Sequence, residues 1–562
     1  MQSELLDGML AHLRRRGPDG IGRWCGPESF LATTRLGIVA PDSASGPYEA
    51  AGGRVRVVAN GEIYNEPELR EALKSAGYVF RTEVDTEVLA HAYDFWGTSF
   101  VERLDGIFAF VLLDLGRRQL MAARDPLGVK PLYLRRIGPG VVYASTCAVL
   151  NAIGGDGGEL CHRALVEFLY RQSIAAPRTI FRHIESVEPG TSQLVAFGSG
   201  SVSVSRYWSP APAYSPQATP VDERVEARLD GVLHATCVAQ SRTDRHTRLA
   251  LSGGIDSALL ASECVSSGLG DAAVFLRLPG NRDESRCAQM TATWCGLEFR
   301  RLSPLKNLDA AIEDWLAVSD GPPSDGFNTY LLCGALPSQV AVLYSGLGAD
   351  ELFFGYPELN SLTADGSHII DRFLRATALI PPDTLGVIAE WLEVDLRDVV
   401  LEIRGEIEEI VNGVRDYGPA EALRHLLIRR YLSSRLLADA DTYSMCHGVE
   451  MRVPYLSRDI VSLALSVPPP TPQQRSKPIL RALANRRGLP TGVVDAPKRG
   501  FTLPYNSLLH STIGSAGRLG LAPDHPATPF RTWVLWSVAR WAARRGRDLP
   551  SLLTSLSGGG AG

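Results

Sequence analysis

A glycine-rich loop after a short apolar run is the feature that most constrains how this chain can fold. The apolar residues 249–251 predict a buried strand, and the loop SGGIDS at 252–257 leads into a helical pattern. Glycines let backbone N–H groups approach a phosphate closely, and the following helix N-terminus adds a favourable dipole. The loop lacks the Lys-Ser/Thr pair of a Walker A motif. We therefore predict a loop that binds the pyrophosphate part of ATP.

Asp256 adds a second constraint within this loop. A carboxylate beside pyrophosphate repels it unless a divalent cation lies between them, so Asp256 predicts bound Mg²⁺. Cleavage of ATP between its α- and β-phosphates is the chemistry that this arrangement favours. An ordinary strand-to-helix turn can carry the same residues, so the rest of the chain has to decide between the two interpretations.

Composition limits the classes of protein to which the chain can belong. Its 562 residues suffice for two or three domains, and a net charge of -5 gives no basic field for nucleic acid. The nine cysteines form no CxxC pair and no zinc-type spacing, which is typical of reduced thiols. No apolar stretch reaches the length of a membrane span. We expect a cytoplasmic protein that binds neither nucleic acid nor membrane.

The pattern of apolar runs divides the chain into segments. Residues 1–208 carry short apolar runs separated by Gly, Asn and Asp, which predicts an α+β domain with antiparallel sheets. Residues 209–221, rich in Pro, Ser and Ala, predict a linker, and residues 551–562 predict a disordered tail. Residues 222–550 alternate helical patterns with short strands, which predicts a parallel sheet covered by helices. Helical periodicity dominates 367–440 and 455–490.

A series of short motifs occurs in an order that matches one family. In the first half these are RRGPDG at 15–20, RLGIV at 35–39, NGEIYN at 60–65, DTEV at 85–88 and RDPLG at 124–128. In the second half they are SGGIDS, SGLGADE at 345–351, the run 439–454 and PKRGF at 497–501. Together they cover nearly the whole chain and resemble the glutamine-hydrolysing asparagine synthetase family.

The resemblance implies two domains and two active sites. The first domain is expected to be a class II glutamine amidotransferase domain, an Ntn-hydrolase-like αββα sandwich that releases ammonia from glutamine. The second is expected to be an α/β PP-loop ATP pyrophosphatase domain with added helices, which adenylates a carboxylate that ammonia then attacks. The implied cofactors are ATP and Mg²⁺, and the implied substrates are glutamine or free ammonia and an aspartate-like acid. A homodimer is the assembly considered.

The resemblance also implies a glutamine site in the first domain. Arg35 can hold an α-carboxylate with two hydrogen bonds, and Asp85 can hold an α-ammonium. Asn60 and Gly61 are similar to the family's oxyanion donors. Asn-Gly is also a common hairpin turn, and that alternative stays open at this point. The residues assigned to glutamine are Arg35, Val39, Asn60, Gly61, Glu62 and Asp85.

The glutaminase nucleophile does not appear at its expected place. The family uses a cysteine directly after the initiator methionine, with its own α-amino group as the base. This chain begins MQSE, and the motif at 16–20 lies some fifteen residues earlier than the family leads one to expect. Either the sequence starts at an internal methionine, or the glutaminase activity is lost. Cys25 is interpreted as structural, and this polypeptide is expected to rely on free ammonia or another amine.

The resemblance assigns the ATP site to the second domain. Asp256 and Asp350 are similar to the Mg²⁺ ligands, and Lys498 resembles the catalytic lysine on a mobile segment that closes over the adenylate. The motif at 283–285 belongs to the same set, with a helix cap as an equal alternative. The residues assigned to ATP are Leu251, Ser252, Gly253, Gly254, Asp256, Ser257, Leu276, Ser345 and Gly346.

Two positions depart from the family pattern around the acceptor. Standard members have Gly-Glu-Gly, with the glutamate as a base for ammonia, where this chain has Leu347 between Gly346 and Gly348. Leucine cannot accept a proton. A branch of the family with Gly-Leu-Gly and a sequence like that at 325–330 resembles this chain most closely. Ser457 stands where an aspartate is usual, so the acceptor pocket is expected to differ.

Three functions follow from these observations. The leading one is an ATP-dependent amidotransferase that converts aspartate or a related acid to an amide. The second is an amide ligase or cyclase of the β-lactam synthetase or lasso-peptide cyclase type, with a non-hydrolytic first domain. The third is a catalytically silent binding protein, which is the weakest because Asp256, Asp350 and Lys498 are all retained.

Overall fold

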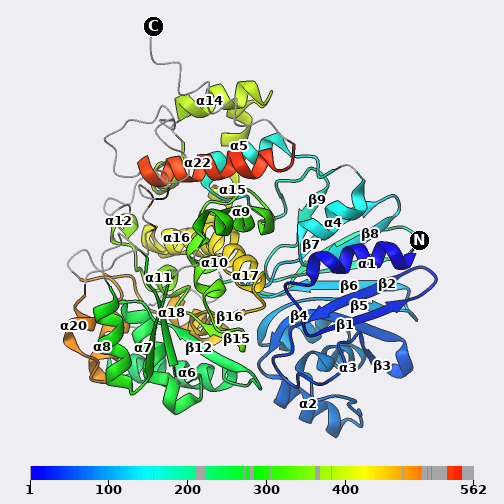
Figure 1. The fold of residues 1–562 in the computed structure, drawn as a ribbon, viewed down its shortest axis with the longest axis horizontal. Coiled ribbons are helices and arrows are strands. Elements are labelled where there is room, and N and C mark those ends of the chain that lie inside the picture. The colour runs from blue at the N-terminus through cyan, green and yellow to red at the C-terminus, as the bar shows by residue number, and fades with distance from the viewer. Residues whose placement is uncertain are drawn as a thin grey trace.

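The fold divides into two halves that lie side by side, one with blue and cyan strands and one with green and yellow elements (Figure 1). The coordinates are a computed structural model. They describe residues 2–155, 157–210, 222–270, 272–278, 284–303, 307–360, 362, 368–380, 382–470, 474–496, 503, 505, 508 and 528–546. The predicted tail and nearly all of the predicted linker lie outside these residues.

The first half is built on a six-stranded antiparallel sheet in the order β11-β10-β6-β5-β4-β3. Its centre is β5 (Gly106–Asp114), in which nearly every residue is buried. Phe108, Phe110 and Leu112 pack toward one face, while the residues between them pack toward the other. The apolar residues run without a polar alternation because both faces of this strand are covered. The other strands of the sheet are β3 (Tyr48–Ala50), β4 (Val55–Ile63), β6 (Gln119–Arg124), β10 (Thr191–Ala196) and β11 (Val202–Arg206).

A second layer of strands covers one face of this sheet. It consists of an antiparallel pair, β1 and β2, and a three-stranded sheet in the order β8-β7-β9. Helices α2 and α3 pack outside the large sheet, and α1 and α4 pack outside the second layer, which gives the predicted αββα sandwich. The remaining bounds are β1 (Gly20–Cys25), β2 (Phe30–Arg35), β7 (Tyr133–Ile137), β8 (Gly140–Ala144), β9 (Ile184–Ser186), α1 (Gln2–Leu13), α2 (Glu66–Ser75), α3 (Val88–Trp96) and α4 (Cys147–Gly154).

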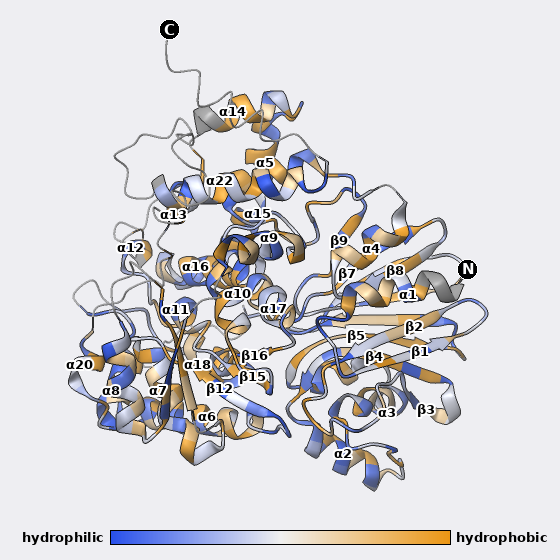
Figure 2. Cartoon of the chain, in the orientation of Figure 1, coloured by the Kyte–Doolittle hydropathy of each residue, from blue (hydrophilic) through white to orange (hydrophobic). Residues whose placement is uncertain are grey.

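The second half is built on a five-stranded parallel sheet in the order β14-β13-β12-β15-β16. Helices lie on both sides of it, and Figure 2 shows hydrophilic as well as hydrophobic residues in the sheet, with the strands Ala272–Leu276 and Val340–Tyr344 apolar throughout. This arrangement confirms the predicted α/β domain. The bounds are β12 (His246–Ala250), β13 (Ala272–Leu276), β14 (Glu298–Leu302), β15 (Val340–Tyr344), β16 (Glu450–Arg452), α6 (Glu223–Gln240), α7 (Ile255–Ser267), α8 (Ser285–Cys295), α18 (Arg458–Ser466) and α19 (Pro478–Arg486).

A helical region extends the second half beyond the sheet and confirms the helical periodicity of the sequence. Helix α5 (His162–Arg171) of the first half packs against three of its helices, so both halves share this apolar core. One segment, Leu427–Leu436, is a π-helix. The α-helices here are α9 (Leu308–Val318), α10 (Phe327–Gly334), α11 (Ala349–Leu352), α12 (Pro357–Asn360), α13 (Ile369–Thr377), α14 (Pro382–Trp391), α15 (Leu396–Asn412), α16 (Pro419–Leu426), α17 (Leu437–Met445) and α22 (Thr528–Ala543). Helix α20 (Thr491–Val494) instead packs beside α7 and α8 at the parallel sheet.

Candidate active sites

The predicted ATP residues lie where three neighbouring parallel strands end. The loop 252–257 follows β12, Leu276 is the last residue of β13, and Ser345 and Gly346 follow β15. The connection from β12 leads to β13 on one side, whereas β15 pairs with β12 on the other. Ligands of open α/β sheets bind in the crevice at such a point, beyond the carboxyl ends of the strands. The structure therefore brings these residues together at the edge where a nucleotide is expected.

The loop is shaped by its own hydroxyl groups. The Oγ atoms of Ser252 and Ser257 lie 3.0 Å apart, and Gly254 N donates to Ser252 Oγ at 3.1 Å. Gly254 is also the N-cap residue of α7. The backbone of the loop thus leads directly into a helix N-terminus, which is the geometry that favours a phosphate.

Asp256 and Asp350 both lie beside one positively charged side chain, that of Lys477. Asp256 lies in the first turn of α7, and Asp350 lies in α11, just after β15. The Nζ atom of Lys477 is 2.5 Å from Asp256 Oδ2 and 2.5 Å from Asp350 Oδ1. Sequence reasoning did not single out Lys477. Its signal was a lysine directly before a proline and a helical pattern, which many surface lysines share.

The two carboxylates fit a divalent cation. Asp256 Oδ1 is buried and has no hydrogen-bond partner among the described residues, so its lone pairs face no competing donor there. Within the same residues no group of three or more His, Cys, Asp and Glu side chains could hold a metal ion. Mg²⁺ commonly takes one or two carboxylates together with substrate phosphates and water. A metal at this place would therefore draw its remaining ligands from a nucleotide and from water.

Two predicted members of this site lie outside the described residues. They are Lys498, predicted to be catalytic, and Asp283 of the motif at 283–285. Ser285 begins α8, and Glu284 lies against the loop, since a Cβ on Gly253 would be 3.2 Å from Glu284 Cβ. The prediction for Lys498 stays a prediction.

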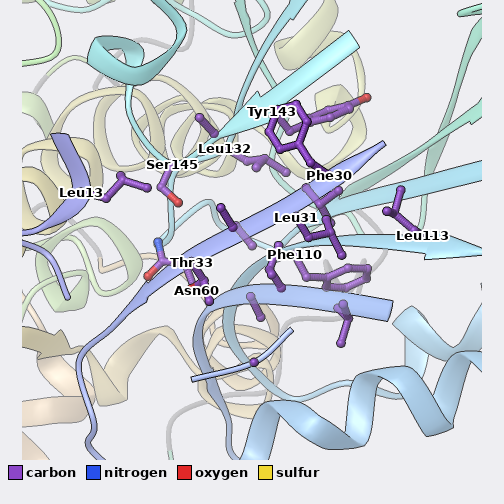
Figure 3. A pocket seen from close by; sticks show the side chains of 18 of the residues that line it. Leu13, Phe30, Leu31, Thr33, Asn60, Phe110, Leu113, Leu132, Tyr143 and Ser145 are labelled. Carbon is purple, nitrogen blue, oxygen red and sulfur yellow. The ribbon is translucent and has the colours of Figure 1, made fainter. Parts of the chain in front are cut away.

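The six residues assigned to glutamine line one cavity in the first half. Its volume is about 450 Å³, and it extends between the two layers of strands. Every residue of β2 and of β8 contributes to its wall. Figure 3 shows Asn60 and Thr33 at one end, with Phe30 and Tyr143 farther along. The assigned residues are Arg35, Val39, Asn60, Gly61, Glu62 and Asp85.

Asn60 and Gly61 lie inside a strand, so the hairpin-turn alternative is wrong. They belong to β4 and pair with Ala109 and Phe108 of β5. Gly61 has φ +123°, and a Cβ there would lie 1.9 Å from the carbonyl oxygen of Ile107. Asn60 Nδ2 is buried without a hydrogen-bond partner among the described residues, which leaves a donor available for a ligand.

Arg35 is engaged differently from the sequence-based expectation. Its Nη1 donates to the carbonyls of Pro41 and Ser43, both at 3.0 Å. Its Nη2 donates to the carbonyls of Val39 at 2.7 Å and Ala40 at 2.8 Å. The four terminal N–H groups of the guanidinium therefore hold the loop 39–43 beside the cavity. A ligand carboxylate would have to use Nε or displace one of these carbonyls.

Asp85 and Glu62 are buried carboxyl groups at the same end of the cavity. Burial raises the pKa of Asp85 to about 6, against the backbone hydrogen bond from Ile63 N at 2.8 Å. Burial, and then the nearby charge of Asp85, raise the pKa of Glu62 well above its usual range despite Arg452. Both groups are held in surroundings where a cationic ligand would stabilise the charged form.

A line of buried charges leads from this cavity across to the second half. Glu62 Oε1 lies 3.1 Å from Arg452 Nη2, and Arg452 Nε lies 3.0 Å from Glu450 Oε1. Lys130 Nζ lies 3.2 Å from Glu450 and 3.5 Å from Asp441. Asp441 in turn accepts from Arg16 Nη2 at 2.7 Å. We call this set, Glu62, Arg452, Glu450, Lys130, Asp441 and Arg16, the charge ladder.

The charge ladder was not predicted as a unit. Arg16 belongs to the motif at 15–20, and the second-half members belong to the run 439–454. These motifs were recognised, but one sequence gives no indication that they meet. In space the ladder alternates in sign at each step, so each buried charge has a partner of opposite sign.

The two positions that depart from the family pattern have local structural surroundings. Leu347 is half-buried and packs against the core of the second half. Ser457 is the N-cap of α18 and accepts from Ile460 N at 3.3 Å, while its Oγ also lies 3.0 Å from Thr236 Oγ1. The role of Ser457 in the structure is therefore to begin a helix, which does not support its place in the acceptor pocket.

Within the described residues, no helix is long and apolar enough to cross a membrane. Family comparisons add the following likenesses. A profile described as a glutamine amidotransferase domain matches residues 1–208, and one described as asparagine synthase matches residues 228–515. Glutamine-hydrolysing asparagine synthetase 1 of Bacillus subtilis is 28% identical over 545 residues, which cover 90% of this chain and 85% of that protein.

Two further likenesses cover less or are more distant. Asparagine synthetase 2 of Oryza sativa is 32% identical over 366 residues, 61% of this chain and 55% of that protein. A solved structure of the allosteric regulatory enzyme of purine biosynthesis is 15% identical, with a TM-score of 0.29, over 66% of this chain and 76% of its own. The last value is too low to support an argument.

Proposed function

Because the chain belongs to the asparagine synthase family, as an ATP-dependent amidotransferase, we propose that it adenylates aspartate or a related acid and transfers the acyl group to ammonia. The observation that carries this proposal is the convergence of Asp256 and Asp350 beside the loop 252–257. Two carboxylates next to a phosphate-binding loop suit a reaction whose leaving group is pyrophosphate. We also propose that the boundary between the two domains falls between residues 208 and 222.

The proposed first step is adenylation. The loop 252–257 holds the β- and γ-phosphates through its N–H groups and hydroxyls, and Leu251, Leu276, Ser345 and Gly346 border the rest of the nucleotide. Mg²⁺ held by Asp256 and Asp350 would neutralise the charge of the leaving pyrophosphate. An oxygen of the acceptor carboxylate attacks the α-phosphorus, and the bond to the oxygen bridging the α- and β-phosphorus atoms breaks. Lys498 is proposed to stabilise this charge.

The proposed second step forms the amide. The lone pair of ammonia attacks the acyl carbon, the bond from that carbon to the phosphate oxygen breaks, and AMP leaves. The surplus proton passes to solvent or phosphate, because Leu347 offers no basic atom. The group that removes the proton from the attacking ammonia is therefore not Leu347.

The first half is proposed to recognise glutamine as a source of nitrogen, with free ammonia as the alternative. Asn60 Nδ2 supports this role because it is an uncommitted donor in the cavity, and Asp85 supports it as a buried carboxyl group suited to an α-ammonium. The nine cysteines are all free thiols, which supports the expected cytoplasmic location.

The decisive experiment measures pyrophosphate release with ATP, Mg²⁺, ammonium chloride and L-aspartate, beside a panel of other carboxylic acids. We expect release that depends on both the acid and Asp256, with Asp256→Asn reducing it at least about 100-fold because the metal loses a ligand. Glu298→Gln, which alters an exposed carboxylate at the start of β14, is the matched control and should behave as the unchanged protein.

The products distinguish the remaining functions. Formation of asparagine, or of the amide of another acid, requires ammonia under the proposed function. Pyrophosphate release from an acid that carries its own amine, without added ammonia, would instead establish a ligase or cyclase. An absence of release with every acid would leave only the silent binding protein.

A further inference from the structure

Lys477 is a cation placed where a metal ion is expected. Its side chain is only 3% exposed, and its ammonium lies 2.5 Å from one oxygen of each of Asp256 and Asp350. An ammonium at hydrogen-bond distance from two carboxylates occupies the position from which a divalent cation would bind both. The site therefore contains a positive charge that belongs to the chain itself.

The local backbone is arranged to place this side chain. Lys477 is the N-cap of α19 and has φ +57°, in the left-handed region that residues with a Cβ rarely adopt. Gly355 lies against it, since a Cβ there would be 2.5 Å from Lys477 Cε and 1.8 Å from Asp350 Oδ1. A strained residue opposite a position that only glycine fits is typical of a functional site rather than of a surface ion pair.

The positive charge of Lys477 limits which other cations can bind between Asp256 and Asp350. The ammonium of Lys477 lies 2.5 Å from an oxygen of each carboxylate, so its positive charge faces both of them. A divalent cation bound to the same oxygens would lie within a few ångströms of it, where like charges in a dry site repel strongly. The two cations cannot both lie between Asp256 and Asp350.

The side chain has the means to move. Lysine carries its charge on a flexible four-carbon stem, and its ammonium pairs with any anion within reach. The nearest anions in a loaded site would be the phosphates on the loop 252–257, which Asp256 itself belongs to. An ammonium displaced from the carboxylates could pair there without losing a counter-charge.

We propose that Lys477 and a divalent cation exchange places during nucleotide binding. In the nucleotide-free protein Lys477 neutralises Asp256 and Asp350 and excludes free metal. When the metal arrives with a nucleotide, the metal takes the carboxylates and Lys477 turns to the phosphates. The site thus accepts a metal–nucleotide complex and rejects the metal alone. This inference rests on the proposed function for the identity of the ligand.

The test uses Mn²⁺ as the metal probe and measures its binding by electron paramagnetic resonance on the full chain. Without nucleotide, the unchanged protein should bind Mn²⁺ weakly, and Lys477→Met should bind it at least tenfold more tightly because no ammonium then occupies the position between the two carboxylates. Arg475→Gln is the matched control. It removes a cation two residues away that pairs with Asp495 and contacts neither metal ligand.

A bound nucleotide should strengthen Mn²⁺ binding by the unchanged protein. With α,β-methylene-ATP, which cannot be cleaved between those phosphates, the unchanged protein should bind Mn²⁺ at least tenfold more tightly than without it. Lys477→Met should bind the analogue more weakly than the unchanged protein, since the phosphates lose a cation. Lys477→Arg keeps the charge and should retain weak Mn²⁺ binding in the absence of nucleotide.

Several outcomes would overturn the exchange. Tight Mn²⁺ binding by the nucleotide-free unchanged protein would show that Lys477 does not exclude the metal, and this measurement needs no folded variant. Equal Mn²⁺ affinities for the unchanged protein and a folded Lys477→Met would show a purely structural ion pair. None of these readouts requires turnover, so they remain distinct from a failure to release pyrophosphate.

Discussion

Neighbouring carboxyl groups in this protein are set to very different pKa values. Asp85 and Glu87 belong to the same short 3-10 helix, Asp85–Glu87. Burial raises the pKa of Asp85 to about 6. Burial acts in the same direction on Glu87, but the nearby His91 and hydrogen bonds from Arg81 and Thr82 outweigh burial and lower the pKa of Glu87 to about 2. At neutral pH both carboxyl groups are ionised. Because burial disfavours the charged form of Asp85, a cationic ligand would stabilise that form more than it would stabilise ionised Glu87.

Asp85→Asn should change how stability depends on pH. The pKa of Asp85 is higher in the folded state than in the unfolded chain, so its contribution is present at low pH and is lost as pH rises through about 6. Between pH 4 and pH 7 the unchanged protein should therefore lose about 2 kcal/mol that the variant keeps. Urea denaturation at several pH values measures this difference.

A matched control separates this effect from a general change of charge. Glu83 is an exposed carboxyl group two residues earlier. Glu83→Gln should leave the pH dependence of the free energy of unfolding unchanged. Parallel pH profiles for Asp85→Asn and the unchanged protein would contradict the assignment.

The sequence motifs selected residues that line one cavity, whereas their hydrogen-bond partners could not be predicted. The cavity collects Asn60, Gly61 and Asp85 as the sequence predicted. Arg35 was recognised too, but its guanidinium binds four loop carbonyls, a detail that depends on how the loop 39–43 folds back. Lys477 was missed because its partners, Asp256 and Asp350, come from distant parts of the chain.

Among the elements, β4 both carries residues that line the cavity and pairs with the central strand of its sheet. Asn60, Gly61 and Glu62 follow one another on it, opposite residues 107–109 of β5. At Gly61 the strand approaches β5 so closely that no side chain fits between them. Asn60 and Gly61 both line the cavity, so the tight strand contact lies directly beside it.

Gly61→Ala should therefore be strongly destabilising. The added Cβ would lie 1.9 Å from the Ile107 carbonyl oxygen, at φ +123°. We expect a loss of at least about 3 kcal/mol in the free energy of unfolding, because both strain and overpacking contribute. Thermal and urea unfolding of the first half, followed by its aromatic fluorescence, measure the change.

Gly77→Ala provides the comparison for this substitution. Gly77 has a similar left-handed conformation, φ +92°, but nothing lies within 4 Å of the Cβ position. It should cost only about 1 kcal/mol, from the conformation alone. Equal losses for the two variants would mean that the contact with β5 is unimportant.

Elements with a clear periodicity were predicted from sequence, and the assembly of the two strand layers was not. The unbroken apolar run in β5 reflects burial on both faces, and the alternation of strands and helices after residue 222 indicated the parallel sheet. Asn60-Gly61 was open to a hairpin interpretation because local sequence contains no information on strand partners. Partner strands are set by packing across the whole domain.

In the whole molecule, the charge ladder joins the two halves through their interior. Arg452 is its central second-half member, paired with Glu450 on its own strand and with Glu62 of the first half. Burial opposes the charge of Glu450, but Lys130 and Arg452 outweigh burial and lower its pKa. The ladder is thus a connected set of alternating charges in which Lys130 and Arg452 stabilise the ionised form of Glu450.

Arg452→Met should weaken the contact between the halves more than its size suggests. Removing the cation leaves Glu62 and Glu450 buried without it, and breaking a buried ion pair in this way costs about 3–5 kcal/mol. We expect a large fall in the urea midpoint of the coupled unfolding. Raising the ionic strength should do little to the unchanged protein, since buried pairs are poorly screened.

Arg458→Met is the matched control for the boundary. Arg458 also reaches across it, donating to the carbonyls of Glu102 and Leu104, both at 3.0 Å. Because those acceptors are neutral, the variant should lose only about 1 kcal/mol. If both variants unfolded at the same urea midpoint as the unchanged protein, the charge ladder would not stabilise the contact between the two halves.

The charge ladder also limits how such a chain can be recombined. Each half contributes three of its members, Arg16, Glu62 and Lys130 from the first and Asp441, Glu450 and Arg452 from the second. A half grafted onto a foreign partner would keep its own charges and meet an unrelated set. Hybrid proteins that exchange one half with a relative should therefore fold stably only when all six positions of the charge ladder come from the same parent. The two halves would then be inherited as a matched pair.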